Sequence, residues 1–215
     1  PSGADHLHDL LDHALSRGEL GRLSWPFSIA ASRQIFRGDS FQVVIDRPEA
    51  GLAAALFVLA WQIARTDAPE LRTRVALGVG RVDYLKPDTF PEMAWGEFHG
   101  DGEAFRLSGR QLDEMKQRRW RLAVQTPWPA VNEELALTCR FLDFISEQWT
   151  AAQAHAILAL LRGERQEDTA KALGVSQSAI AQRFSRAAGP VIKEAVGRFS
   201  EIINTNISFF SDNIQ

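Results

Sequence analysis

Two groups of polar residues have types and spacings that could carry chemistry, and the first is the pair Gly38-Asp39. The pair lies between two runs of β-forming residues in the stretch "FRGDSFQVVI". A carboxylate held out at such a turn can bind a metal ion, and metal-dependent nucleotidyl transfer needs at least two carboxylates around Mg²⁺. Glycine and aspartate are also common in two-residue hairpin turns. We favour the turn interpretation, with the metal ligand as its alternative.

The second group lies in "RQEDTAKALGVSQSAIAQRFSRAAG", a pattern typical of a helix, a tight turn and a second helix. Ala170 is small where two helices must cross, Gly174 allows a positive φ in the turn, and Ile180 buries the second helix against the first. In the DNA major groove, glutamine can pair with adenine and arginine with guanine. The residues expected at DNA are Lys171, Ser176, Gln177, Ser178, Gln182, Arg183 and Arg186. The alternative is a three-helix interaction module, and the spacing favours DNA binding.

Hydrophobic patterns predict the elements that would position Asp39. The expected order of helix, hairpin, helix, strand, helix and strand is typical of an α+β sandwich. Within the strand "RVALGVGRV", Gly78 and Gly80 leave one face bare, so that a helix or a ligand could approach the backbone closely. The expected elements are a helix over 5–17, hairpin strands over 27–36 and 41–45, a helix after Pro48, the glycine-containing strand, a loop over 86–98, a helix over 102–117 and a strand in "WRLAVQ".

The later part of the chain is expected to be helical throughout. An amphipathic helix over 131–146 would link two domains, and the next helix would be capped by Thr150 and stopped by Gly163. We therefore expect an α+β domain over 1–128, a linker helix over 129–148, a helical domain over 149–203 and a tail over 204–215.

Composition narrows the classes of protein that these motifs could belong to. The 215 residues are 45% hydrophobic, enough for a core, and no apolar run approaches the roughly 20 residues that span a bilayer. The single cysteine, Cys139, excludes an internal disulfide, and we expect a cytoplasmic protein without a membrane segment. Residues 150–203 carry seven basic against five acidic side chains, so one copy would make few phosphate contacts. We therefore expect a homodimer on double-stranded DNA.

The chain also resembles known families. The segment from Gln166 to Ala188 is similar to the DNA-binding helices of sigma-factor region 4. The stretches "FRGDSFQ", "RVALGVGRV" and "GDGEAFRLSGRQLDEM" resemble the palm fold of nucleotide cyclases and diguanylate cyclases. Together they make the chain similar to the SatD-like family, which implies a ferredoxin-like (cyclase-palm-like) sandwich followed by an all-α helix-turn-helix domain.

The resemblance to cyclases also implies a site. Asp39 matches the metal-binding acid of the hairpin, and its partner acid would end a first strand that we expect to be missing from this chain. The residues implied for a nucleotide or metal site are Gly38, Asp39, Ser40, Gly78, Gly80 and Asp101, with Mg²⁺ or a nucleotide as the ligand.

The expected function is therefore a DNA-binding transcriptional regulator. Its cyclase-like domain would dimerise the protein or sense a nucleotide without catalysis and without a required cofactor. The alternative is a metal-dependent nucleotide cyclase or nucleotidyltransferase in which the C-terminal helices serve only for assembly.

Overall fold

The computed structural model describes residues 34–36, 40–65, 73–87 and 98–212, and it confirms an α+β chain. The chain divides into two compact units: unit 1 comprises Pro1–Arg47 and Arg81–Gly102, and unit 2 comprises Pro48–Gly80 and Glu103–Gln215. The helix predicted over 5–17 lies outside the described residues, and so do Gly38 and Asp39.

The described part of unit 1 consists of antiparallel strand pairs. Strand β1 (Gln34–Phe36) pairs with β2 (Ser40–Gln42), which confirms the predicted antiparallel pairing of the two segments over shorter strands than expected. Strand β4 (Val82–Pro87) pairs with β5 (Phe98–Gly102), whose first residue was predicted to be in a loop. The sequence of β5, "FHGDG", has no β-branched residue, so its strand state depends on pairing with β4 rather than on local propensity.

In unit 2, strand β3 (Val75–Gly78) pairs in parallel with β6 (Leu122–Gln125), and helix α3 (Glu103–Arg118) covers them. A Cβ atom added to Gly78 would lie 2.1 Å from the Ala104 carbonyl oxygen of α3. One added to Gly80 would lie 3.1 Å from the Ala104 backbone nitrogen. The glycine face predicted to admit a helix or a ligand is therefore occupied by a helix.

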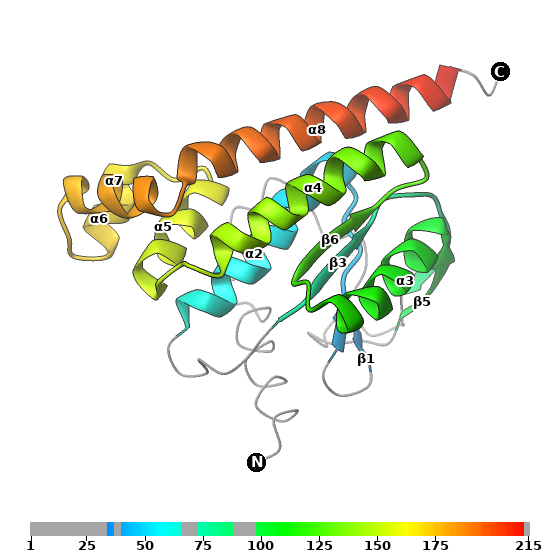
Figure 1. Cartoon of the computed structure of the whole chain (residues 1–215), viewed down its shortest axis with the longest axis horizontal. Helices are drawn as coiled ribbons and strands as arrows, with labels where there is room; N and C mark the ends of the chain where they lie inside the picture. The colour runs from blue at the N-terminus through cyan, green and yellow to red at the C-terminus, as the bar shows by residue number, and fades with distance from the viewer. Residues whose placement is uncertain (1–33, 37–39, 66–72, 88–97, 213–215) are drawn as a thin grey trace, which may run out of the picture. The chain divides into compact units, whose positions relative to one another are not determined.

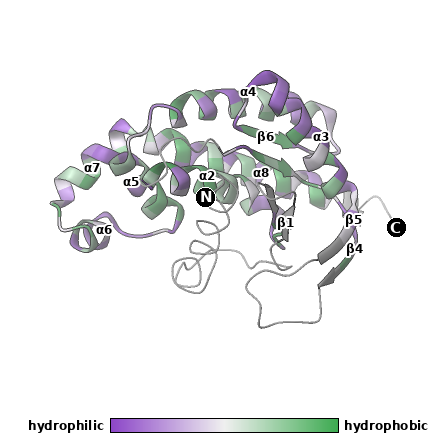
Figure 2. Cartoon of the chain, turned by 90° about the horizontal axis from the view of Figure 1, so that it is seen from below, coloured by the Kyte–Doolittle hydropathy of each residue, from purple (hydrophilic) through white to green (hydrophobic). Residues whose placement is uncertain are grey.

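The core of unit 2 forms where helix α2 (Gly51–Ala64) meets helix α5 (Ala151–Leu161). Helix α2 follows a short 3-10 turn, η1 (Pro48–Ala50), and is apolar nearly all round, as predicted for the helix after Pro48. Its core-facing side chains include Leu52, Leu56 and Leu59, which are at most 1% exposed, and Figure 2 shows α2 as mainly hydrophobic. Because α2 packs on α5, contacts run across the domain boundary predicted at residue 128.

Two long helices, α4 (Pro129–Ser146) and α8 (Gly189–Asp212), contact each other in unit 2 (Figure 1). Helix α8 continues through residues 204–212, which were predicted to form a tail. The cause lies in its apolar spacing, since Phe199, Ile202 and Ile203 are buried and hold the helix against its neighbours. Within the described residues, no helix is long and apolar enough to cross a membrane.

The inner face of α4 carries the apolar residues predicted for it. Leu135, Cys139 and Leu142 are each at most 2% exposed. Burial raises the pKa of the Cys139 thiol to about 12. Cys139 therefore stays a protonated thiol at neutral pH and serves as a small core residue.

A buried polar network joins α4 to the start of β6. Asp143 Oδ2 accepts hydrogen bonds from the Arg121 backbone N–H at 3.1 Å and from Arg140 Nη1 at 2.8 Å. The same Arg140 side chain donates to the Leu122 carbonyl. Asp143 is 7% exposed, so these bonds replace the water that burial removes from its carboxylate.

The network extends from β6 to two further segments of unit 2. Arg121 Nη2 donates to Gln62 Oε1 on α2 at 3.1 Å, and Arg121 Nε donates to the Thr73 carbonyl before β3 at 3.4 Å. Arg121 is 6% exposed, and a guanidinium so deeply buried is tolerated only when it is hydrogen-bonded. These contacts connect segments of the chain that are distant in sequence.

Burial is the dominant electrostatic effect in the network. It raises the pKa of Asp143 and lowers the pKa of Arg140, and in each case the neighbouring opposite charge only partly offsets the shift. The Asp143–Arg140 pair therefore fixes geometry more than it adds net stability. Removing either residue, however, leaves the other as an unpaired buried charge.

Replacing Asp143 with alanine should lower the free energy of unfolding by about 2–4 kcal/mol, because the Arg121 N–H and the Arg140 guanidinium lose a buried acceptor. Urea unfolding followed by circular dichroism measures the change. The matched control is Asp113→Ala, which removes an exposed pair with Lys116 and should have little effect. Equal losses for the two variants would contradict this assignment.

Candidate nucleic-acid interface

The helices that carry the predicted DNA-contacting residues begin with α5, whose two ends are closed by local hydrogen bonds. Thr150 Oγ1 accepts from the Gln153 backbone N–H at 3.3 Å, and Gln153 Oε1 accepts from the Thr150 N–H at 2.8 Å. This capping box confirms the predicted start at Thr150. At the other end, Gly163 has φ of +70° and the Glu164 N–H bonds to the Ala159 carbonyl, which ends the helix as predicted.

Helix α6 (Gln166–Ala172) and helix α7 (Gln177–Arg186) are joined by a tight turn centred on Gly174. Gly174 has φ of +63°, as predicted. Its N–H bonds to the Lys171 carbonyl, and the Val175 N–H bonds to the Ala170 carbonyl at 3.0 Å. These two bonds satisfy the last carbonyls of α6 and fix where the chain leaves it.

The start of α7 is closed by Ser176, as predicted. Its Oγ accepts from the Ala179 N–H at 3.2 Å and lies 2.9 Å from Ser178 Oγ. Because the Ser176 hydroxyl already caps the helix, its main contribution is to position α7.

Packing then sets which face of α7 points outward. Ala170 of α6 and Ile180 of α7 are 4% and 2% exposed, as predicted for the crossing of the two helices. Beyond α7, Trp149 Nε1 donates to the buried Ala187 carbonyl at 3.0 Å. This bond joins the segment between α4 and α5 to the end of α7 and was not predicted.

The side chains opposite Ile180 are exposed. By helical periodicity, Ser178, Gln182 and Arg186 lie on the side of α7 away from its packed face. Arg183 lies nearer the packed face and is half-buried. The exposed members of the predicted DNA-contacting set are Lys171, Ser176, Gln177, Ser178, Gln182 and Arg186.

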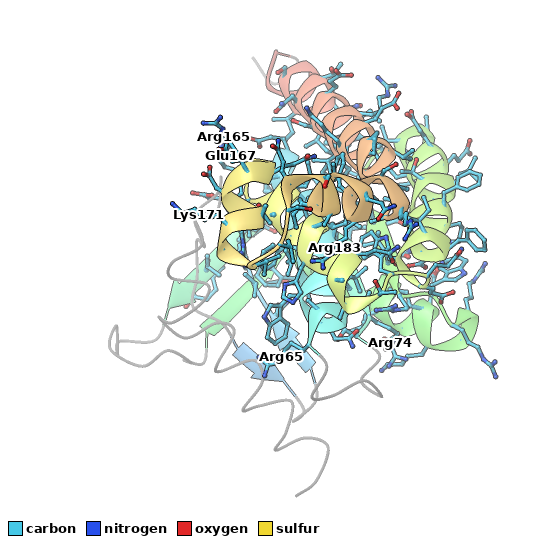
Figure 3. The ribbon with its side chains drawn as sticks, turned by 90° about the vertical axis from the view of Figure 1, so that its left-hand side faces the viewer. Arg65, Arg74, Arg165, Glu167, Lys171 and Arg183 are labelled. Atoms are coloured by element: carbon cyan, nitrogen blue, oxygen red, sulfur yellow. The ribbon has the colours of Figure 1, made fainter. Side chains whose placement is uncertain are left out.

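Two further basic residues lie on the same side of unit 2, and sequence reasoning missed both. Figure 3 shows Arg65, at the end of α2, and Arg74, before β3, on the side that carries Arg183 and α6. The Arg74 side chain is exposed, and Arg65 lies over the Trp61 ring at 5.2 Å. They are about a hundred residues before α7, so only the tertiary packing of unit 2 could reveal their position.

Some of the positive charge on this side is balanced by acids. Arg165 Nη2 lies 3.6 Å from Glu167 Oε2, and Arg162 Nη1 lies 3.3 Å from Glu164 Oε1. Both carboxylates belong to the start of α6 or to the loop before it, whereas α7 itself has no acidic residue. The charge available to an anionic partner therefore increases toward α7.

The predicted nucleotide or metal site stays a prediction, because its residues lie partly outside the described residues and partly in two separate units. Gly38 and Asp39 lie outside the described residues. Ser40 and Asp101 belong to unit 1, whereas Gly78 and Gly80 belong to unit 2 beneath α3. Within β5, Asp101 Oδ1 accepts from the Gly102 N–H at 2.6 Å. Among the described residues, no group of three His, Cys, Asp or Glu side chains is placed to hold a metal ion.

Comparison with known proteins adds no independent assignment. No family model, curated protein or solved structure matches the chain. The function is therefore inferred from the geometry and chemistry of α6 and α7.

Replacing Gly174 with alanine should lower the free energy of unfolding by about 1 kcal/mol, because alanine is strained at positive φ. No atom lies within 4 Å of the added Cβ, so the loss isolates backbone strain. Gly197→Ala is the matched control: its Cβ also meets no atom, but it lies in the interior of α8 and should stabilise by about 0.5–1 kcal/mol. Thermal unfolding of both variants measures the changes in stability. If both variants were stabilised, or both destabilised, the role given to Gly174 would be refuted.

Proposed function

We propose that the chain is a DNA-binding transcriptional regulator in which α6, the Gly174 turn and α7 form a helix-turn-helix. In this proposal α7 enters the major groove. The observation that carries it is the exposed row of Ser178, Gln182 and Arg186 on a helix whose opposite face is anchored by Ile180. A rigid helix with long polar side chains on its free face suits direct reading of base edges.

The side chains have the chemistry that base reading requires. Glutamine presents a donor and an acceptor together, which matches N6 and N7 of adenine, and we assign this role to Gln177 and Gln182. Arg183 would pair with guanine by extending from the edge of the packed face, and Ser178 would bond to either kind of base. Lys171 and Arg186 would contact phosphates, and Ser176 would hold the start of α7 in place.

Charge favours a dimer for this function. Seven basic against five acidic residues over 150–203 allow few phosphate contacts, and Arg65 and Arg74 would add two more from outside that segment. Two copies on half-sites about 34 Å apart would combine modest contacts into useful affinity. A homodimer is therefore part of the proposal.

We assign no reaction to the α+β elements. The parallel pair of β3 and β6 covered by α3 supports a palm-like, ferredoxin-like sandwich, in which nucleotide sensing or a contribution to dimerisation would be the remaining roles. The close approach of α3 to Gly78 argues against a phosphate group at that glycine.

Selection of the full chain against a random duplex library should enrich a defined sequence, and Gln182→Ala should then weaken binding to it by about 5- to 150-fold. Loss of one bidentate base contact is the reason, so binding to unrelated duplexes should change little. Fluorescence anisotropy at several salt concentrations measures both affinities.

Phosphate contacts have a separate signature in the same assay. Lys171→Ala should weaken binding to all duplexes alike and reduce the salt slope by about one. Lys116→Ala, an exposed lysine on α3, is the matched control and should leave affinity unchanged.

Unaltered affinity and sequence preference in Gln182→Ala would show that α7 does not read DNA.

A further inference from the structure

Helix α4 carries a second apolar surface that faces outward. Leu137, Phe141 and Phe144, which we call the outer stripe, are 60%, 61% and 66% exposed. Their spacing of four and then three residues places them in one row along the helix. They are the most exposed large hydrophobic side chains among the described residues.

The outer stripe is exposed because of how the other side of α4 is held in the fold. The inner face of α4 is already filled by Leu135, Cys139 and Leu142. Asp143 and Arg140 tie the same helix to β6 through hydrogen bonds that fix its rotation about its own axis. The stripe therefore cannot turn inward without breaking the buried network, and its apolar area can be removed from water only by another surface.

We propose that the outer stripe is covered by the same stripe of a second copy of this chain, so that two α4 helices pack against each other. This inference goes beyond the proposed DNA binding and does not depend on it. Spacings of four and then three residues are those of the seam of a two-helix coiled coil. Glu134, which pairs with Arg198 of α8 at 3.1 Å, occupies the preceding seam position, and α4 ends at Ser146, just beyond the stripe. A short apolar seam with polar ends matches another seam of the same length.

The area fits a dimer of modest size. Three side chains of this kind, each more than half exposed, leave roughly 400 Å² of apolar surface on each chain. Pairing two such stripes would remove roughly 800 Å² from water, so the roughly 1,000 Å² expected of a specific interface requires only about 200 Å² more from polar residues beside the stripes. In a two-fold arrangement Phe141, the middle residue, lies nearest the axis and contacts the partner's stripe most fully.

Sedimentation equilibrium of the full chain in the absence of DNA tests the interface. The parent protein should be a dimer at micromolar concentration, and Phe141→Asp should weaken self-association at least about 100-fold, because each copy would bury a charge at the centre of the interface. The matched control is Val191→Asp on α8, which replaces another exposed apolar residue, 51% exposed, and should leave the dimer intact. A monomeric parent, or equal dimerisation of Phe141→Asp and the parent, would overturn the proposal.

Cross-linking provides a measurement that holds even if the aspartate variant fails to fold. Phe141→Cys should form a disulfide between two copies under mild oxidation, since the buried Cys139 is shielded from reaction. Val191→Cys should cross-link far less. Equal cross-linking of the two variants would show that another surface joins the copies. A parent protein that forms the dimer but does not bind DNA would contradict the role proposed for α7 and leave this interface intact.

Discussion

The buried hydrogen bonds around Asp143 are the constraint on which the rest of unit 2 depends. They join α4 to the first residues of β6, and through Arg121 they reach α2 and the segment before β3. Each buried charge in the network costs free energy unless its partners stay in place, so the elements cannot shift independently. The network therefore acts as a geometric clamp, while the burial of apolar side chains where α2 packs on α5 stabilises the unit.

This clamp determines how two outward surfaces are presented. It sets the rotation of α4 and so leaves Leu137, Phe141 and Phe144 exposed. Trp149, which follows α4, bonds to the Ala187 carbonyl and thereby relates α4 to the end of α7. Ile180 and the Gly174 turn then direct the Gln182 side of α7 outward. The surface proposed for a second copy and the surface proposed for DNA are thus parts of one rigid frame.

Local signals made much of this frame predictable from the sequence. Thr150, Gly174, Ser176 and Ile180 act through neighbours a few residues away, and the structure has each of them as predicted. The Arg121–Asp143 bond joins residues that are distant in sequence, and strand β5 depends on its pairing with β4. No local sequence pattern revealed either of them. The outer stripe becomes visible only once the opposite face of α4 is known to be filled. Asp39 lies outside the described residues, so its role stays a prediction.

The central claim is that α7 is the surface that meets DNA. The most direct measurement is a nuclear magnetic resonance titration of the isotope-labelled chain with a short duplex at low salt, following each backbone amide. The account predicts that the largest shifts cluster on residues 173–186, while the amides of the outer stripe on α4 stay unchanged. Shifts confined to other elements, with those of α7 unaltered at saturating DNA, would contradict it.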